Sequence, residues 1–185
     1  MIKRHMLLGY YIDKSYEIKN INNASITFYE DKVFLYFETE EDRDFEELAE
    51  EIVKINLHSF PGGEKWIEMI DIFHYSYPYN NNYWKRKLNN KKTVFKISYL
   101  KPEKVGEYVF YHYKLQREAS LGYDKYGVIY MYRNMLVMYY EEPSEEVDTS
   151  LVENRWKKVI PDYDGNIIAD LSIPFDDGFR GWRSM

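Results

Sequence analysis

The stretches ITFYEDKVFLYFE (26–38) and IYMYRNMLVMYYE (129–141) can be laid on each other without a gap. Each has two arms rich in β-branched and aromatic residues on either side of a polar turn, which is the pattern of a β-hairpin. We therefore predict two similar hairpins and an internal duplication of the chain. The aligned pairs include Ile26 with Ile129, Tyr29 with Tyr132, Tyr36 with Tyr139, and Glu38 with Glu141.

The first hairpin is flanked by segments with clear periodicity. The apolar run 5–12 predicts a strand, and residues 66–75 alternate between apolar and polar well enough to predict another. Residues 40–55 predict an amphipathic helix whose first turn is acidic, as the helix dipole favours. Its apolar stripe consists of Phe45, Leu48, Ala49, Ile52 and Ile55.

The pattern restarts after a polar, Asn-rich connection at 76–92, which is the expected boundary between two halves. Residues 93–99 predict a strand, and Pro102 is well placed in the first turn of a helix that ends near Gly122. The second hairpin then follows. Further expected elements are a helix at 144–159, a short strand at 166–173 and a loop-rich tail at 174–185.

Each half follows the order β–(α)–β–β–α–β, which is the ferredoxin-like order. We predict an α+β protein with ferredoxin-like halves at 1–78 and 93–173, forming in tandem a single domain like a dimeric α+β barrel. The first half has little room for its first helix between Ile12 and Ala24. Two sheets packed face to face would bury both hairpins and leave a cavity between sheet and helix.

Composition excludes several classes of function. The formal charge is −6, without the dominant basic face of a nucleic-acid binder, and we expect the basic residues between Lys85 and Lys92 to lie in a solvated loop. The chain has no cysteine, and its four scattered histidines lack a metal-binding spacing, so we expect no metal and no cofactor. Without a membrane-spanning or signal segment, a cytoplasmic protein is expected.

The segment GEYVFYHYKLQ (106–116) holds the one candidate catalytic pair. Tyr108 and His112 are four residues apart on the predicted helix, so their Cβ atoms lie about 5–6 Å from each other and both side chains can face one ligand. The other interpretation, a core histidine bonded to a tyrosine or a backbone carbonyl, stays open. The stripe that carries the pair consists of Val105, Tyr108, Val109, His112 and Leu115.

Residues 99–142 resemble the L-rhamnose mutarotase family, a branch of the dimeric α+β barrel superfamily. The helix pattern Glu-Tyr-x-x-x-His is matched by Glu107, Tyr108 and His112. The resemblance covers about a quarter of the chain. The hairpin pattern that follows is matched by Tyr126, Ile129, Asn134, Leu136 and Glu141.

This resemblance implies an enzyme that interconverts the anomers of a small aldose by acid–base catalysis, with His112 and Tyr108 as catalytic residues. Family members are short chains that dimerise, whereas this chain can supply both halves itself, and a homodimer stays open. A sugar-like ligand is the expected partner, with no nucleic acid and no membrane. Candidate substrate-binding residues are Tyr126, Tyr130, His74 and Trp182.

Two other functions stay open. A non-catalytic ligand-binding or protein-interaction domain would keep His112 packed and inaccessible, and a haem-binding relative would need a histidine that faces a wide apolar cavity. Two carboxylates could also carry protons. They are Asp71, which alternates with apolar residues, and Glu141, which ends the second hairpin, although an exposed or salt-bridged role suits both.

Overall fold

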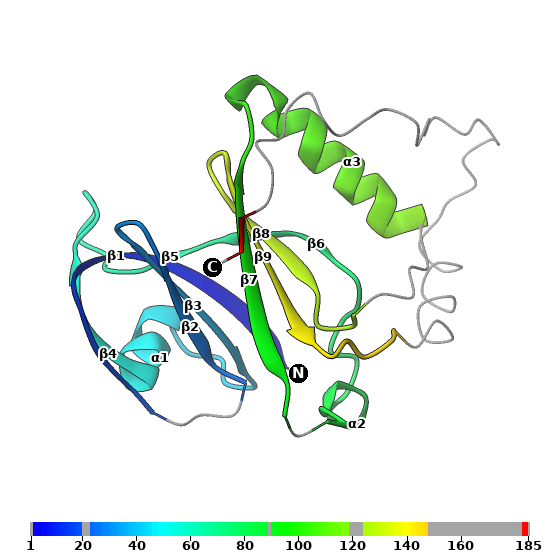
Figure 1. Cartoon of the computed structure of the whole chain (residues 1–185), viewed down its shortest axis with the longest axis horizontal. Coiled ribbons are helices and arrows are strands. Elements are labelled where there is room, and N and C mark those ends of the chain that lie inside the picture. The colour runs from blue at the N-terminus through cyan, green and yellow to red at the C-terminus, as the bar shows by residue number, and fades with distance from the viewer. Residues whose placement is uncertain (1, 20–22, 89, 119–123, 148–182, 185) are drawn as a thin grey trace. The chain divides into compact units, whose positions relative to one another are not determined.

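The computed structural model describes residues 2–19, 23–88, 90–118, 124–147 and 183–184. The chain divides into two compact units, and each carries one antiparallel sheet with helices (Figure 1). The predicted α+β class is therefore confirmed. Unit 1 comprises Met1–Ile70, Pro78–Asn89 and Met185, and unit 2 comprises Asp71–Tyr77 and Asn90–Ser184.

The sheet of unit 1 has the strand order β2-β3-β1-β4, and a short strand β5 also pairs with β1. The sheet is open, with β2 at one edge and β4 at the other. The predicted hairpin is confirmed as β2 and β3. The strands are β1 (Lys3–Ile18), β2 (Ser25–Tyr29), β3 (Lys32–Thr39), β4 (Val53–His58) and β5 (Ile67–Glu68).

Strand β1 is longer than the predicted 5–12 and continues to Ile18. Its register against β4 shifts between Tyr11 and Tyr16, so the strand has an irregularity there. The Asp13 carboxylate stabilises this bend by accepting hydrogen bonds from the Ser15 backbone N–H at 2.8 Å and from the Asn56 side chain at 3.3 Å. The sequence prediction was wrong about this strand end because residues 13–18 are polar enough to resemble a loop.

Helix α1 (Phe45–Ile52) covers one face of this sheet. Asp44 caps its start, since the carboxylate accepts hydrogen bonds from two N–H groups of the first turn. The predicted helix is confirmed, but it ends earlier than expected, because β4 begins at Val53. The helix and the sheet together form a core that comprises Leu7, Val33, Leu35, Phe37, Leu48, Ala49, Ile52, Val53, Leu57 and Trp66.

The sheet of unit 2 has the order β10-β7-β9-β8-β6, also with two open edges. The described residues therefore form two open sheets and no closed barrel, which differs from the predicted barrel-like domain. Both predicted arms of the second hairpin and the strand before the helix are confirmed. Pro102 begins a 3₁₀ turn, η1 (Pro102–Lys104), which leads directly into α3 (Val105–Glu118). The strands are β6 (Ile70–His74), β7 (Lys92–Tyr99), β8 (Val128–Tyr132), β9 (Met135–Glu142) and β10 (Arg183–Ser184).

The predicted strand at 66–75 is divided between the two sheets. Its first part is β5, which pairs with β1, and its second part is β6, at the edge beside β8. A four-residue helix, α2 (Asn81–Trp84), lies in the connection that follows. The predicted helix at 144–159 is not helical over 144–147, and its remainder lies outside the described residues, as does the predicted strand at 166–173.

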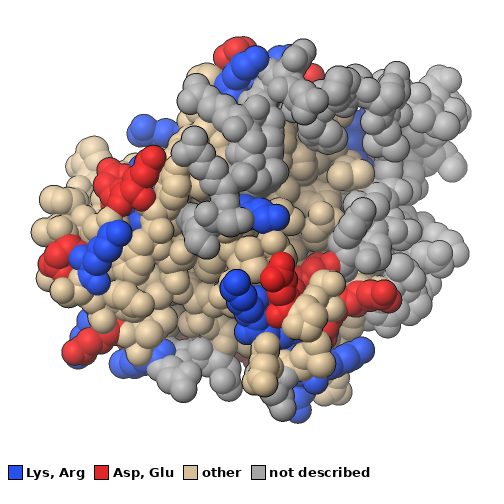
Figure 2. Space-filling view, viewed as in Figure 1, with Lys and Arg blue, Asp and Glu red and all other residues tan. Residues whose placement is uncertain are grey.

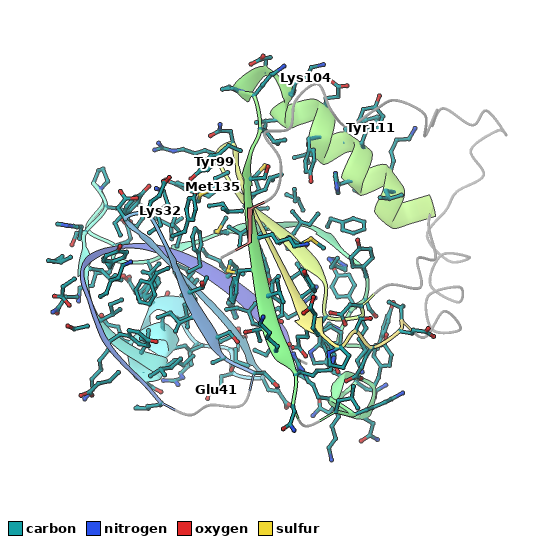
Figure 3. The ribbon with its side chains drawn as sticks, in the orientation of Figure 1. Lys32, Glu41, Tyr99, Lys104, Tyr111 and Met135 are labelled. Atoms are coloured by element: carbon teal, nitrogen blue, oxygen red, sulfur yellow. The ribbon has the colours of Figure 1, made fainter. Side chains whose placement is uncertain are left out.

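The two hairpins share one register. Ile26 pairs with Leu35 in β2 and β3, and Ile129 pairs with Met138 at the equivalent place in β8 and β9. The turn residues Glu30 and Arg133 both have φ 55°. The likeness extends to the preceding strand, where Tyr99 lies beside Met135 (Figure 3) as Tyr10 lies beside Lys32.

Substitutions at two glycines test this packing, and we expect opposite effects on the free energy of unfolding. A Cβ added at Gly9 would meet Leu57 Cδ1 at 3.0 Å and the Trp66 ring at 3.2 Å, so G9A should lower the free energy of unfolding by about 1–3 kcal/mol. A Cβ at Gly106 in α3 would meet nothing within 4 Å, and G106A should raise that free energy by about 0.5–1 kcal/mol. Urea unfolding measures both, and a stabilising G9A would contradict the close packing of Trp66 on β1.

Candidate functional site

Helix α3 presents its predicted stripe to the sheet of unit 2. Tyr108 belongs to the buried core with Phe73, Leu100, Ile129 and Leu136, and Val105 and Leu115 pack against that core. His112 lies on the same stripe and is 7 % exposed. The opposite face of α3 carries Phe110 and Tyr113, each 56 % exposed, so the helix is amphipathic in the direction that the spacing predicts.

The imidazole of His112 has a fixed orientation. Its Nδ1 lies 3.0 Å from the backbone carbonyl oxygen of Tyr108, one turn earlier. A carbonyl can only accept, so Nδ1 carries the proton and Nε2 keeps the lone pair when the ring is neutral. The ring stacks on that of Tyr108 with centroids 4.0 Å apart and meets the Phe73 ring edge-on at 5.4 Å.

Burial makes both members of the pair uncharged at neutral pH. Desolvation lowers the pKa of His112, although its hydrogen bond to the Tyr108 carbonyl acts in the opposite direction. Desolvation, with a smaller contribution from Tyr75, raises the pKa of the Tyr108 phenol above its usual range. The pair is therefore a neutral imidazole that can accept a proton and a neutral phenol that can donate a hydrogen bond.

The predicted substrate-binding tyrosines lie elsewhere in unit 2. Tyr130 is 1 % exposed, and because strand residues alternate, it lies on the sheet face opposite Ile129 and α3. Tyr126 is fully buried, with its hydroxyl 3.4 Å from Glu145 and its ring beneath the ammonium groups of Lys91 and Lys125 at 4.5 and 4.8 Å. The structure therefore does not bring Tyr130 to the His112 side of the sheet.

His74 is held by its own strand. Its Nδ1 lies 3.0 Å from the Asp71 carboxylate, and its ring meets the Tyr77 ring edge-on at 3.9 Å. It follows Phe73, the residue that contacts His112, and alternation directs it to the other side. Asp71 is thus salt-bridged to a histidine, the simpler of the roles considered for it. Trp182 lies outside the described residues.

A cluster of buried charges surrounds Tyr126. The ammonium group of Lys91 lies 3.2 Å from Glu145 and 3.6 Å from Glu141, and that of Lys125 lies 3.1 Å from Glu145. All four side chains are at most 8 % exposed. Asp124 joins them by accepting hydrogen bonds from backbone N–H groups, including that of Glu141 at 2.8 Å, while desolvation raises its pKa.

Unit 1 has an equivalent arrangement on its own hairpin. The Tyr36 hydroxyl donates to Glu38 at 2.7 Å, as the Tyr139 hydroxyl donates to Glu141 at 2.9 Å. Glu38 is paired with Arg86 through two hydrogen bonds of 2.5 and 2.7 Å. The sequence alignment of the hairpins therefore identified both carboxylates as equivalent, although it did not predict their cations.

Two of the basic residues expected in a solvated loop are in fact largely shielded from solvent and paired with these carboxylates. The side chains of Arg86 and Lys91 are 13 % and 6 % exposed, which corrects that prediction. Their neighbours Lys85, Lys87 and Lys92 are exposed, as expected. Elsewhere on the visible face of the molecule, acidic and basic side chains alternate and neither sign dominates (Figure 2).

The described residues contain no group of three or more His, Asp or Glu side chains arranged to hold a metal ion. Within the same part of the chain, no helix is long and apolar enough to cross a membrane. Comparison of the chain with family models found no match, and neither did the comparisons with curated proteins and with solved structures. A functional assignment therefore depends on the chemistry of the side chains themselves.

The buried cluster predicts a sharp contrast between two neighbouring lysines. K91M removes a cation and leaves Glu141 and Glu145 underpaired in the interior, so it should lower the free energy of unfolding by about 3–5 kcal/mol. K92M changes an exposed residue and should alter it by less than about 0.5 kcal/mol. Equal effects in urea unfolding would show that the charges of this cluster are not buried as described.

The lowered pKa of His112 predicts a pH dependence of stability. Below about pH 6.5 the unfolded chain binds a proton at His112 that the folded chain does not. The free energy of unfolding therefore decreases as the pH is lowered, until the pKa of His112 in the folded chain is reached. H112N should remove a slope of up to about 1.4 kcal/mol per pH unit. Urea titrations between about pH 7 and 5 measure this slope. H58Q, at an exposed histidine, should leave it unchanged.

Proposed function

We propose that the chain interconverts the anomers of a small aldose by acid–base chemistry at His112 and Tyr108. The observation that carries the proposal is the hydrogen bond from Nδ1 to the Tyr108 carbonyl, which fixes Nε2 as the acceptor of a buried, neutral imidazole. Mutarotation needs a group that takes the proton of the anomeric hydroxyl and returns it later, and a neutral imidazole suits that task.

The reaction opens the sugar ring and closes it again. The anomeric O–H proton passes to Nε2 of His112 as the bond between C1 and the ring oxygen breaks. The imidazolium formed in this way then gives the proton to the ring oxygen, so that His112 is neutral again once the ring is open. The open-chain aldehyde turns about the C1–C2 bond and closes on its other face as the protons return. With its raised pKa, Tyr108 stays protonated and acts as a hydrogen-bond donor rather than as the acid.

The resemblance of residues 99–142 to the L-rhamnose mutarotase family gives this proposal its substrate class. The strand orders support the finer prediction of two ferredoxin-like halves, since β4-β1-β3-β2 and β10-β7-β9-β8 are the same order. A sugar-like molecule is the partner that this proposal requires.

A second candidate function, a non-catalytic binding domain, is favoured by one observation. His112 is only 7 % exposed, and the rings of Tyr108 and Phe73 contact it on two sides. A histidine packed in this way serves a structural role unless a ligand reaches Nε2. The two candidates differ in whether wild-type protein accelerates anomer exchange of any aldose.

The proposed reaction predicts a graded loss of activity. H112A should lower the rate of anomer exchange by about 10²–10⁴-fold, because the proton carrier is lost. Y108F should lower it about tenfold, because it removes one hydrogen-bond donor. Saturation-transfer NMR on a panel of aldoses measures exchange directly. Y113A, on the exposed face of α3, is the matched control and should exchange sugars at the wild-type rate.

The outcome that separates the candidates is simple. If wild-type protein binds an aldose but accelerates anomer exchange of none, it is a binding domain, and the catalytic proposal fails. Acceleration that survives in H112A would instead assign the reaction to other residues.

A further inference from the structure

Ser98 carries a buried hydroxyl on β7. It lies near the end of β7 and is 2 % exposed. Among the residues that the structure describes, its Oγ has no hydrogen-bond partner. Leaving a hydroxyl buried and unsatisfied costs about 1–3 kcal/mol, so such a group needs an explanation.

Ser98 faces the side of the sheet that α3 covers. It pairs directly with Leu136 on β9, and side chains of directly paired residues project from the same face of an antiparallel sheet. Leu136 belongs to the core that includes Tyr108, and so does Leu100, two residues after Ser98 on the same side. The hydroxyl is therefore on the same layer as Tyr108 and His112.

The equivalent position in unit 1 is filled differently. Gly9 pairs with Val33 as Ser98 pairs with Leu136, and these two hairpin positions are equivalent in the aligned sequences. At Gly9 even a Cβ would be crowded, because Trp66 and Leu57 occupy the space above it. At the equivalent position unit 2 has Ser98, whose side chain is polar, where unit 1 has no side chain. The two units thus diverge where unit 2 carries its candidate pair.

We propose that Ser98 is a ligand-binding residue, whose hydroxyl bonds to a hydroxyl group of a neutral, polyhydroxylated ligand on the α3 side of the sheet. The inference rests on the proposed function, since it adds a third group to the same site. A hydroxyl both donates and accepts, as sugar hydroxyls do. Together with an imidazole acceptor and a phenol donor it forms an uncharged set, which suits a neutral ligand better than a phosphate or a carboxylate.

The test compares the stability of the ligand-free protein with its affinity for sugars. S98A removes an unsatisfied group, so the ligand-free protein should unfold at the same or a higher urea concentration than wild type. Its affinity for the sugars that wild type binds should fall about five- to tenfold, the value of one hydrogen bond. The probes are L-rhamnose, D-glucose, D-galactose and D-ribose, with binding measured by saturation-transfer difference NMR.

The matched control is T93V, which removes a hydroxyl from the same strand on the face away from α3. It should leave sugar affinity at the wild-type value. S98T, which keeps the hydroxyl, should retain more affinity than S98A wherever the added methyl is accommodated. These two variants distinguish loss of a hydroxyl at this one place from a general effect on β7.

Each result decides the inference. If ligand-free S98A is less stable than wild type, the hydroxyl already has a partner, such as a buried water. That result would overturn the Ser98 inference. Unchanged affinity in S98A, with exchange still dependent on His112, overturns the Ser98 inference while the proposed function stands. Weakened binding in S98A, without anomer exchange in wild type, supports Ser98 and removes the catalytic proposal. Absence of binding to every sugar overturns both.

Discussion

The last residue but one of each central strand is a buried glutamate, and its carboxylate requires a cation beside it. Glu38 in β3 and Glu141 in β9 accept a hydrogen bond from a tyrosine two residues earlier, and both are nearly fully buried. A carboxylate removed from water costs several kcal/mol unless a cation is held against it. The cations, Arg86 and Lys91, come from a single connection. Each unit therefore takes the cation for its own glutamate from this connection.

These two charge pairs show how a polar, Asn-rich segment makes buried contacts. Residues 85–92 have the composition of a solvated loop, and most of their side chains are indeed exposed. Its buried contacts are the two charge pairs of Arg86 and Lys91, and it has no apolar stripe in its sequence. Arg86 donates hydrogen bonds to Glu38 from two guanidinium nitrogens. Lys91 instead pairs its single ammonium group with both Glu141 and Glu145. The same local chemistry is thus achieved with different residues in the two units.

The periodic part of the sequence was sufficient to predict much of this fold. Both hairpins, α1 and the buried stripe of α3 follow from spacing, because an apolar face leaves a repeat of 2 or 3.6 in the residues. The same alternation places Tyr130 away from His112, which a list of tyrosines alone could not show. Features stabilised by single polar contacts leave no such repeat. The bend of β1 at Asp13 and the partner of Lys91 are of this kind.

Histidines show the same limit. The Nδ1 of His5 lies 2.6 Å from Glu68, a residue that is brought beside it only when β5 pairs with β1, and no spacing in the sequence predicts this contact. His112 was predictable because its partner, the Tyr108 carbonyl, belongs to the same helix. Local contacts can be inferred from spacing, whereas contacts between distant segments require the strand order to be known first.

The equivalence of the two units makes their differences informative. The backbone N–H of Tyr11 donates to the Asp31 carbonyl at 3.2 Å, and that of Leu100 donates to the equivalent Asn134 carbonyl at 2.8 Å. The two units differ in one respect: unit 2 has α3 between β7 and β8, whereas unit 1 continues β1 as an extended strand. A helix over the sheet brings polar groups into a layer that would otherwise be aliphatic. In that layer the Ser98 hydroxyl has no partner among the described residues, and a ligand that bonds to it would explain why a buried polar group is retained beneath α3.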